Sequence, residues 1–316
     1  MKFIAEFCQN HNGDLTLVEE MVHQAADAGA SYAKIQTIFA DDLIFREQFE
    51  EGKVENGITV VIKRPYQPEY DRLKKLELTF EQHAQFIAIC EKYKIKPMTT
   101  CFTRGSVEKL AQFSWDTIKV ASYDCGSVPL VKDLAAKFKH LIISTGSTFD
   151  EEINATAELL RTLKKDFTFL HCVTIYPTPL NELNLNRLKY LQKLAPHVGY
   201  SDHTLVARDG VKGAMAAIYM GAKYIERHFT ILGVNETKDG PVSVLPRHVK
   251  ELLAFSNLSR SFQKQYLKEN VPEFASMLGT EIRSLSAPEL LNRAYYRGRF
   301  ATQKSAEVYY NWEDTS

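Results

Sequence analysis

Short apolar or β-branched runs alternate with longer amphipathic stretches over most of the chain. A short run of this kind is typical of a buried strand, and apolar residues three and four apart are typical of a helix that packs on a sheet. The pattern predicts eight strands, over Phe3–Cys8, Tyr32–Thr37, Lys96–Phe102, Thr117–Ser122, His140–Thr145, Phe167–Thr174, His197–Ser201 and Tyr224–Thr230. Helices are predicted between them, including Leu15–Ala28, Thr79–Tyr93, Asp150–Lys164 and Ala207–Met220. Eight repeats predict an α/β protein with a (β/α)8 TIM barrel, because a doubly wound sheet usually has about five or six strands.

Two regions depart from this repeat. Asp41–Tyr70 is a long excursion after the second predicted strand, interrupted by glycines and prolines, and we expect it to cover the mouth of the barrel. From Gly279 onward the strong apolar periodicity is lost. We therefore expect a catalytic barrel over residues 1–278 and a short C-terminal extension over residues 279–316, which is too short to have its own core.

The composition excludes several classes of protein. Apolar residues make up 45% of the 316 residues and charged residues 25%, which is ordinary for a globular protein and unlike a disordered or fibrous one. Basic and acidic side chains number 39 each, so the charge gives no reason to expect a nucleic acid or a membrane as a partner. Five cysteines without a C-x-x-C pair favour free thiols, buried as small core residues. With no signal peptide and no apolar run of ~18 residues, we expect a cytoplasmic protein.

Polar side chains cluster at the C-terminal ends of the predicted strands, where barrel enzymes place their chemistry. Lys34 and Lys119 lie on two different strands, at positions where a lysine is costly to bury without an anionic partner. One such lysine alone is equally well explained by a structural ion pair. Two of them, beside hydroxyl residues, indicate a shared phosphorylated ligand. The hydroxyl groups expected to donate hydrogen bonds to it belong to Thr100, Ser122, Ser144 and Ser201.

Two histidines, His203 and His228, stand at the ends of the seventh and eighth predicted strands. Neutral imidazoles brought together across a barrel mouth suit a divalent transition metal. Either histidine alone is better explained as a side chain bonded to backbone or to a carboxylate. Their pairing, with Glu6 and Asp202 expected close by, favours a metal site.

Seven motifs recur in the order found in one known family. They are Gln9–Leu15, Lys34–Thr37, Lys119–Ser122, Ser144–Gly146, His171–Pro179, Ser201–Thr204 and Glu226–Thr230. With these motifs the chain, from about Phe3 to Phe300, resembles the sialic acid (N-acetylneuraminate) synthase family, which includes the legionaminic and pseudaminic acid synthases.

The resemblance implies an enzyme, a carbon–carbon bond-forming transferase. It would condense phosphoenolpyruvate with an open-chain aldose, N-acetylmannosamine-like or a related hexose derivative, to give a nonulosonic 2-keto-3-deoxy acid and phosphate. It also implies a homodimer and a divalent metal, usually Mn²⁺ with Mg²⁺ or Co²⁺ as alternatives, held by His203 and His228. The catalytic residues implied are Glu6, which would handle a proton, and the same two histidines. The phosphoenolpyruvate contacts implied are Lys34, Thr100, Lys119, Ser122, Ser144, Thr174 and Ser201, and the sugar contacts are Gln36, Asp124, Tyr176 and Asp239.

The sequence departs from the family pattern on the sugar side. Asp124 stands where the family often has glutamate, and Thr174 stands where the sialic acid synthases carry asparagine. Val242 takes the place of an aspartate that contacts the sugar. A valine cannot accept a hydrogen bond from a hydroxyl group, so we expect either a different acceptor or a different contact, for which Asp239 is the candidate.

A second departure concerns the C-terminus. The family usually continues into an antifreeze-like (SAF) domain that supplies an arginine to the sugar site of the partner subunit. Here the linker-like segment Tyr295–Phe300 is followed by 16 residues, so we expect this chain to lack that domain. Arg297 and Arg299 are the candidates to replace the arginine.

Two other functions stay open on the residues alone. Lys34 or Lys119 could form a Schiff base in a pyruvate-type aldolase, which predicts trapping by borohydride and indifference to chelators. That function would leave the two histidines and the hydroxyl residues without a role. The other alternative is a catalytically silent barrel that binds a sugar or acts as a scaffold, but every chemically demanding position is filled.

Overall fold

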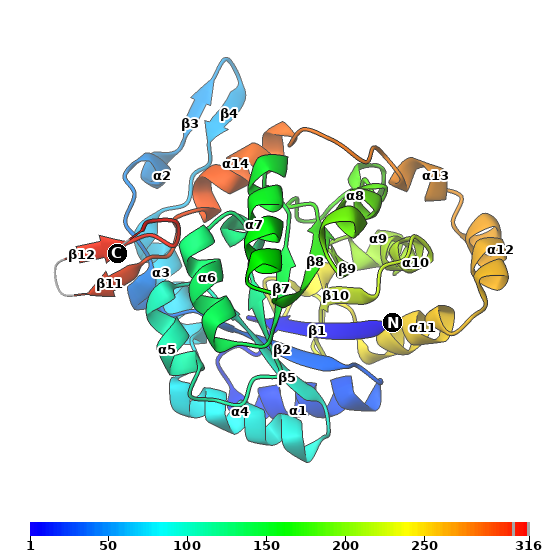
Figure 1. Ribbon diagram of the computed structural model, residues 1–316, viewed down its shortest axis with the longest axis horizontal. Helices are drawn as coiled ribbons and strands as arrows, with labels where there is room; N and C mark the ends of the chain where they lie inside the picture. Colours follow the sequence, from blue (N-terminus) through cyan, green and yellow to red (C-terminus); the bar gives the residue numbers. More distant parts are fainter. Residues whose placement is uncertain (305–306, 315–316) are drawn as a thin grey trace.

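Eight parallel strands close into a barrel in the computed structural model of this chain, which describes residues 1–304 and 307–314 (Figure 1). The strands are β1 (Lys2–Cys8), β2 (Tyr32–Thr37), β5 (Lys96–Cys101), β6 (Thr117–Val120), β7 (His140–Ser144), β8 (Asp166–Cys172), β9 (His197–Asp202) and β10 (Tyr224–His228). Neighbours around the barrel follow the chain order, and β1 closes the ring between β10 and β2. The predicted (β/α)8 fold is confirmed.

Helices on the outside of the barrel bury one apolar face each. In α1 (Leu15–Asp27), Asp14 caps the helix by accepting a hydrogen bond from the backbone N–H of Thr16 at 2.8 Å, and Val18 and Met21 lie on the buried face. The other outer helices are α4 (Phe80–Lys92), α5 (Val107–Leu110), α6 (Val128–Lys137), α7 (Asp150–Thr162), α8 (Arg187–Leu194), α11 (Pro246–Ser256), α12 (Arg260–Asn270) and α13 (Phe274–Met277). Within the described residues, no helix is long and apolar enough to cross a membrane.

One predicted helix is divided in two. The amphipathic pattern predicts a single helix over Ala207–Met220, but the structure has α9 (Val206–Asp209) and α10 (Lys212–Tyr219). Gly210 lies between them with a φ of 55°, a left-handed conformation that glycine adopts without strain and that ends a helix. The spacing of apolar residues does not reveal this break, because the glycine interrupts the helical backbone while the apolar pattern continues across it.

A closed apolar layer fills the lower part of the barrel lumen. It consists of Ile4, Tyr32, Met98, Ile142, Leu170 and Tyr224. β9 contributes Gly199 at this level, because a Cβ there would lie only 2.6 Å from Cδ2 of Leu170. Successive side chains of a strand point to opposite faces. Residues two positions further along each strand therefore face the same lumen, one layer closer to the C-terminal ends.

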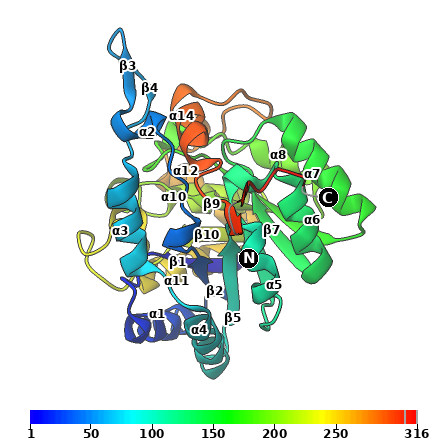
Figure 2. The same ribbon diagram turned by 90° about the vertical axis from the view of Figure 1, so that its left-hand side faces the viewer.

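The excursion after β2 covers the mouth only in part. It contains the short helix α2 (Gln48–Glu51), the antiparallel strands β3 (Lys53–Glu55) and β4 (Ile58–Val61), and the helix α3 (Tyr66–Leu76). Figures 1 and 2 show the β3–β4 hairpin projecting away from the barrel, whereas α3 runs alongside it. The expected cover is therefore limited to α3 and the residues next to it.

The C-terminal extension packs against this excursion. It contains α14 (Ala287–Tyr296) and the two-stranded β11 (Thr302–Lys304) and β12 (Glu307–Tyr309). The backbone N–H of Ile44 donates to the carbonyl of Arg299, and that of Ala301 donates to the carbonyl of Asp42, both at 3.0 Å. The two segments that the repeat did not explain thus lie together beside the mouth. Residues 305–306 and 315–316 of the predicted extension lie outside the described residues, and the division at residue 278 stays a prediction.

Candidate active site

A polar layer lies directly above the apolar layer of the lumen. Most of its members stand two positions after an apolar-layer residue, and Lys119 and Ser201 occupy the same level on β6 and β9. The layer, which we call the floor, consists of Glu6, Lys34, Thr100, Lys119, Ser144, Ser201 and Glu226. It lines a cavity of about 410 Å³ at the C-terminal ends of the strands.

Lys34 is the more strongly paired lysine of the floor. Its Nζ forms ion pairs with the carboxylate of Glu6 and with Oε2 of Glu226, the latter at 3.2 Å, and donates to Oγ1 of Thr100 at 3.1 Å. Burial alone would lower the pKa of Lys34, but the carboxylates of Glu226 and Glu6 outweigh burial and raise the pKa. The ammonium group is therefore held in its charged form.

Lys119 is less well compensated. Its Nζ lies 4.0 Å from Oε1 of Glu226 and donates to Oγ of Ser144 at 2.7 Å. Burial lowers the pKa of Lys119, and the positive charge of Lys34 adds to this effect, while Glu226 opposes both. Lys119 therefore has the most to gain from an incoming anion.

Glu226 joins the two lysines, and the sequence interpretation gave it no role. Its Oε1 accepts a hydrogen bond from Oγ of Ser201 at 2.8 Å. Burial would raise the pKa of Glu226, but Lys119, Lys34 and the Ser201 hydroxyl outweigh it and hold the pKa well below its usual range. The signal was available, because Glu226 precedes His228 by two residues and strand alternation places both in the lumen.

Six of the seven residues predicted to contact phosphoenolpyruvate line the cavity, namely Lys34, Thr100, Lys119, Ser122, Ser144 and Ser201. Thr174 is not among the lining residues. Its hydroxyl contacts that of Ser147, and its carbonyl accepts a hydrogen bond from Nδ2 of Asn292 in α14 at 2.7 Å. β8 ends at Cys172, which faces the lumen, and the chain then turns under α14. Thr174 is thus engaged outside the cavity.

The two predicted metal-binding histidines lie side by side in the cavity wall. The ring centroids of His203 and His228 are 5.4 Å apart, and Tyr176 packs on His203 with a centroid distance of 4.1 Å. Burial lowers the pKa of His203 well below its usual value, and the neighbouring His228 adds to the effect. His203 is therefore neutral at physiological pH, which is the form of imidazole that binds metals.

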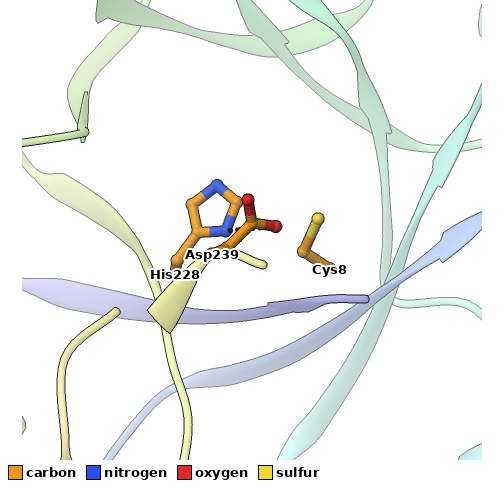
Figure 3. Close-up of side chains that lie close together, drawn as sticks. All are labelled: Cys8, His228 and Asp239. Atoms are coloured by element: carbon orange, nitrogen blue, oxygen red, sulfur yellow. Dashed lines mark ion pairs between the residues drawn. The ribbon is translucent and has the colours of Figure 1, made fainter. Parts of the chain in front are cut away.

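A carboxylate lies close to the ring of His228. Its Nδ1 is buried and makes no hydrogen bond with any residue that the structure describes, although Oδ2 of Asp239 lies 3.5 Å away. Burial would lower the pKa of His228, but Asp239 and Glu6 raise it. Among the described residues, Cys8, His228 and Asp239 bring one potential ligand atom each to within 4.8 Å of one another (Figure 3). A neutral imidazole, an unpartnered ring nitrogen and a nearby carboxylate together fit a divalent metal.

Asp202, expected near the histidines, does not face the cavity. Its Oδ2 forms an ion pair with Nη1 of Arg227 at 2.8 Å, and both side chains are fully buried. Arg227 points outward from β10 because it alternates with Glu226 and His228. Asp202 and Arg227 therefore fasten β9 to β10 behind the site.

All four residues predicted to contact the sugar line the cavity, namely Gln36, Asp124, Tyr176 and Asp239. Asp124 follows β6 and accepts hydrogen bonds from Oγ of Ser127 and from Nδ2 of Asn311, both at 2.9 Å. Burial raises the pKa of Asp124 to about 6. Val242 is not a lining residue, so Asp239 is the acidic group that the segment after β10 brings to the cavity.

Four cationic side chains, which we call the rim, border the cavity away from the floor: Arg64, Arg72, Lys238 and Arg299. Glu69 of α3 pairs with Nη2 of Arg72 at 2.7 Å and also with the guanidinium of Arg299. Arg299 is buried, and its Nε has no hydrogen-bond partner among the described residues. The rim therefore carries more positive than negative charge.

The structure separates the two arginines that were candidates to replace the domain-supplied arginine. Arg299 lines the cavity. Arg297 turns away, contacts the carboxylate of Glu152, and lies over the ring of Trp312 at 5.0 Å. Only Arg299 is placed to meet a ligand.

A closed (β/α)8 barrel whose ionisable groups gather in a cavity at the C-terminal ends of its strands is the architecture of a barrel enzyme. A family model described as the NeuB family matches residues 21–265, and the chain belongs to that family. The predicted family and the predicted class, a carbon–carbon bond-forming transferase, are thereby confirmed.

Individual relatives agree with this assignment. The chain is 33% identical over 261 residues to N,N'-diacetyllegionaminic acid synthase of Campylobacter jejuni, covering 79% of this chain and 73% of that protein. It is 27% identical over 310 residues to pseudaminic acid synthase of the same species, covering 97% and 83%. The structure of the sialic acid synthetase of Leptospira borgpetersenii, a complex with citrate, matches with a TM-score of 0.68 at 25% identity, covering 93% of this chain and 90% of that one.

Proposed function

We propose that this chain condenses phosphoenolpyruvate with an open-chain aldose to give a sialic-acid-like 2-keto-3-deoxy acid and phosphate. The observation that carries the proposal is the floor of the cavity. Two lysines from different strands and several hydroxyl groups face one space, with two histidines at its wall. The related legionaminic and pseudaminic acid synthases support the class of product.

The donor substrate is assigned to the floor. Lys119 and Lys34 bind the phosphate, and Thr100, Ser122, Ser144 and Ser201 donate hydrogen bonds. Because Glu6 and Glu226 already balance the two lysines, the rim supplies the excess positive charge that a multiply charged anion needs.

The reaction joins carbon 3 of phosphoenolpyruvate to the aldehyde carbon, whose oxygen takes up a proton. Water then adds at carbon 2 and phosphate leaves. Glu6, a floor residue paired with Lys34, is the carboxylate assigned to proton transfer. Gln36, Asp124, Tyr176 and Asp239 are assigned to the sugar, on the opposite side from the apolar layer.

His203 and His228 are assigned to a divalent metal, with Mn²⁺ as the first candidate and Mg²⁺ or Co²⁺ as alternatives. Such a metal supplies Lewis-acid polarisation of the aldehyde oxygen when bound. The chain's own part is to present neutral imidazole: burial keeps His203 unprotonated, and Tyr176 packs on its ring. A homodimer is part of the same proposal.

The test is phosphate release from phosphoenolpyruvate with Mn²⁺ across a panel of aldoses and N-acylated hexosamines, with and without a chelator. We expect release that requires both one sugar and the metal. The variant His203→Ala should lose turnover by about 100-fold or more while its circular dichroism stays unchanged. Full turnover of that variant in the presence of chelator would contradict the metal assignment.

The same preparation distinguishes the Schiff-base alternative. Burial lowers the pKa of Lys119, a property that an imine-forming lysine also requires. An aldolase would be inactivated by borohydride in the presence of pyruvate, whereas a synthase of the proposed kind would not. Borohydride inactivation together with indifference to chelator would overturn the proposal.

A further inference from the structure

We infer that Cys8 is a metal ligand, so that a thiolate from Cys8 and a carboxylate from Asp239 join the imidazole of His228 around the cation. The inference deepens the proposed function, on which it rests, by changing the donor set of the metal site and by moving Asp239 from the sugar contacts to the metal ligands. Two histidines alone would offer only nitrogen. With Cys8 and Asp239 the site offers sulfur, nitrogen and oxygen.

The three side chains reach one point from three separate elements. Cys8 ends β1, His228 ends β10, and Asp239 belongs to the loop that follows β10 (Figure 3). Their potential ligand atoms lie within 4.8 Å of one another. Ligand atoms around a tetrahedral metal with bonds of about 2.0–2.3 Å lie roughly 3.5 Å apart, so small side-chain rotations complete the site.

One atom of this cluster lacks a hydrogen bond, which is a second indication of a ligand. Nδ1 of His228 is buried and makes no hydrogen bond within the described residues. A buried polar atom without a partner is rare in folded proteins, and a missing ion is one of the few explanations for it. Asp239 lies 3.5 Å from that nitrogen, on the same side as Cys8.

The backbone of Cys8 directs its side chain into the cavity. Cys8 has a φ of 48°, in the left-handed region that glycine occupies without strain and other residues enter at a cost. The β1–β2 pairing shifts register between Glu6 and Cys8, and the N–H of Cys8 donates to Oε1 of Glu6 at 2.6 Å. Such a bulge re-aims a side chain, and here the thiol lines the cavity. Cys8 thus adopts a backbone conformation that is strained for a non-glycine residue, and this conformation presents its sulfur to the cavity.

A thiolate changes which metals the site prefers. Soft sulfur ligands favour Zn²⁺ and Co²⁺, whereas Mg²⁺ and Mn²⁺ favour oxygen. When the sulfur–metal bond forms, the thiol proton is released to solvent. The site as drawn from Cys8, His228 and Asp239 therefore binds Co²⁺ and Zn²⁺ more tightly than Mg²⁺.

The experiment uses Co²⁺ as a spectroscopic probe of the protein freed of metal. A cobalt–thiolate bond produces an intense charge-transfer absorption in the near ultraviolet, and this signal needs no substrate or turnover. We expect it in the wild type and expect its loss in Cys8→Ser, with Co²⁺ affinity lowered by about 10- to 100-fold. Cys8→Gly, which removes the thiol and suits the backbone conformation, should lose the band while staying folded.

Two control variants test which cysteine supplies the sulfur bound to Co²⁺. Cys90→Ala removes a buried thiol of α4, remote from the cavity, and should keep the band. Cys172→Ala removes the other thiol of the cavity, whose Sγ lies 3.8 Å from Nδ1 of His203, and should also keep it. Loss of the band in Cys172→Ala but not in Cys8→Ser would overturn the inference.

The remaining outcomes separate this inference from the proposed function. A wild type that binds Co²⁺ without the band, or binds none, overturns the role of Cys8, even if phosphate release is metal-dependent. A band that requires Cys8 supports the ligand assignment, even if no sugar in the panel is consumed. In that second case only the proposed function fails.

Discussion

On the floor of the cavity two lysines face two glutamates, whereas the rim has four cationic side chains, of which only Arg72 and Arg299 pair with a carboxylate, that of Glu69, among the described residues. The floor comes from strand ends that are fixed by barrel hydrogen bonds. The rim comes from α3 and the segment just before it, from the loop after β10 and from the C-terminal extension. Buried charge on the floor must be balanced for the barrel to fold, because an unpaired buried ion costs several kcal/mol. The rim, closer to solvent, can keep an excess.

The difference indicates a division of labour. The balanced floor holds its groups in fixed positions, and the unbalanced rim supplies the field that draws in an anion. Substitutions on the floor should therefore lower both the stability of the fold and the turnover. Substitutions on the rim should mainly lower the affinity for substrate.

The largest effect is expected from Lys34→Met on the floor. The change leaves Glu6 and Glu226 buried beside an apolar side chain, so the free energy of unfolding should fall by about 3–5 kcal/mol in urea denaturation. The control is Lys96→Met, which breaks the exposed 2.9 Å ion pair with Asp116 and should cost about 0–1 kcal/mol. Equal losses in the two variants would contradict the idea of a charge-balanced floor.

A smaller effect is expected at Asp124, between floor and rim. Its pKa of about 6 in the folded protein is above the unfolded value of about 3.9, so folding favours the protonated carboxyl. The resulting stabilisation is present below about pH 4 and is lost as pH rises through about 6. The wild type should therefore lose up to about 3 kcal/mol relative to Asp124→Asn over this range. Urea midpoints at several pH values test this, and parallel curves would refute it.

On the rim, Arg299→Ala should act on the substrate. We expect kcat/KM for phosphoenolpyruvate to fall by about 10- to 100-fold, because a buried guanidinium beside the cavity is removed. Arg297→Ala is the matched control, since Arg297 contacts Glu152 instead of the cavity, and it should keep kcat/KM within about threefold. Similar losses in both variants would show that the extension matters only as a structural support.

The smallest effect is expected from salt. Raising the ionic strength screens the rim more than the buried floor, so kcat/KM should fall by about two- to fivefold between low and moderate salt. Arg64→Gln should make this dependence shallower without changing the urea midpoint. If the variant and the wild type show the same salt dependence, Arg64 does not contribute to the positive electrostatic potential of the rim.

Sequence patterns were sufficient for the floor because strand alternation is local. Lys34, Lys119 and the hydroxyl residues could be assigned to the lumen from the strands that carry them. The same alternation places Glu226 in the lumen, two residues before His228, but a carboxylate that balances both lysines is not evident until the strands are brought together. Thr174 does not line the cavity, and the sequence does not reveal this because an apolar run does not mark the residue at which β8 ends.

The rim could not be predicted in the same way. Arg299 meets Glu69 across 230 positions of the chain, and no periodicity links the two. The conformation of Cys8 was equally hidden, because a shift of register between two strands leaves no mark on composition. Groups that meet through long-range packing or through backbone irregularity require coordinates.

The position of Arg299 after all eight barrel strands sets an order of assembly on the ribosome. Every floor residue leaves the ribosome before the extension does, and a nascent barrel can close around the apolar layer while α14 is still unmade. Such an intermediate has its lysines and histidines in place but lacks Asn292, Tyr296 and Arg299 at the mouth. The cavity therefore has its complete lining only after residue 300 has been translated.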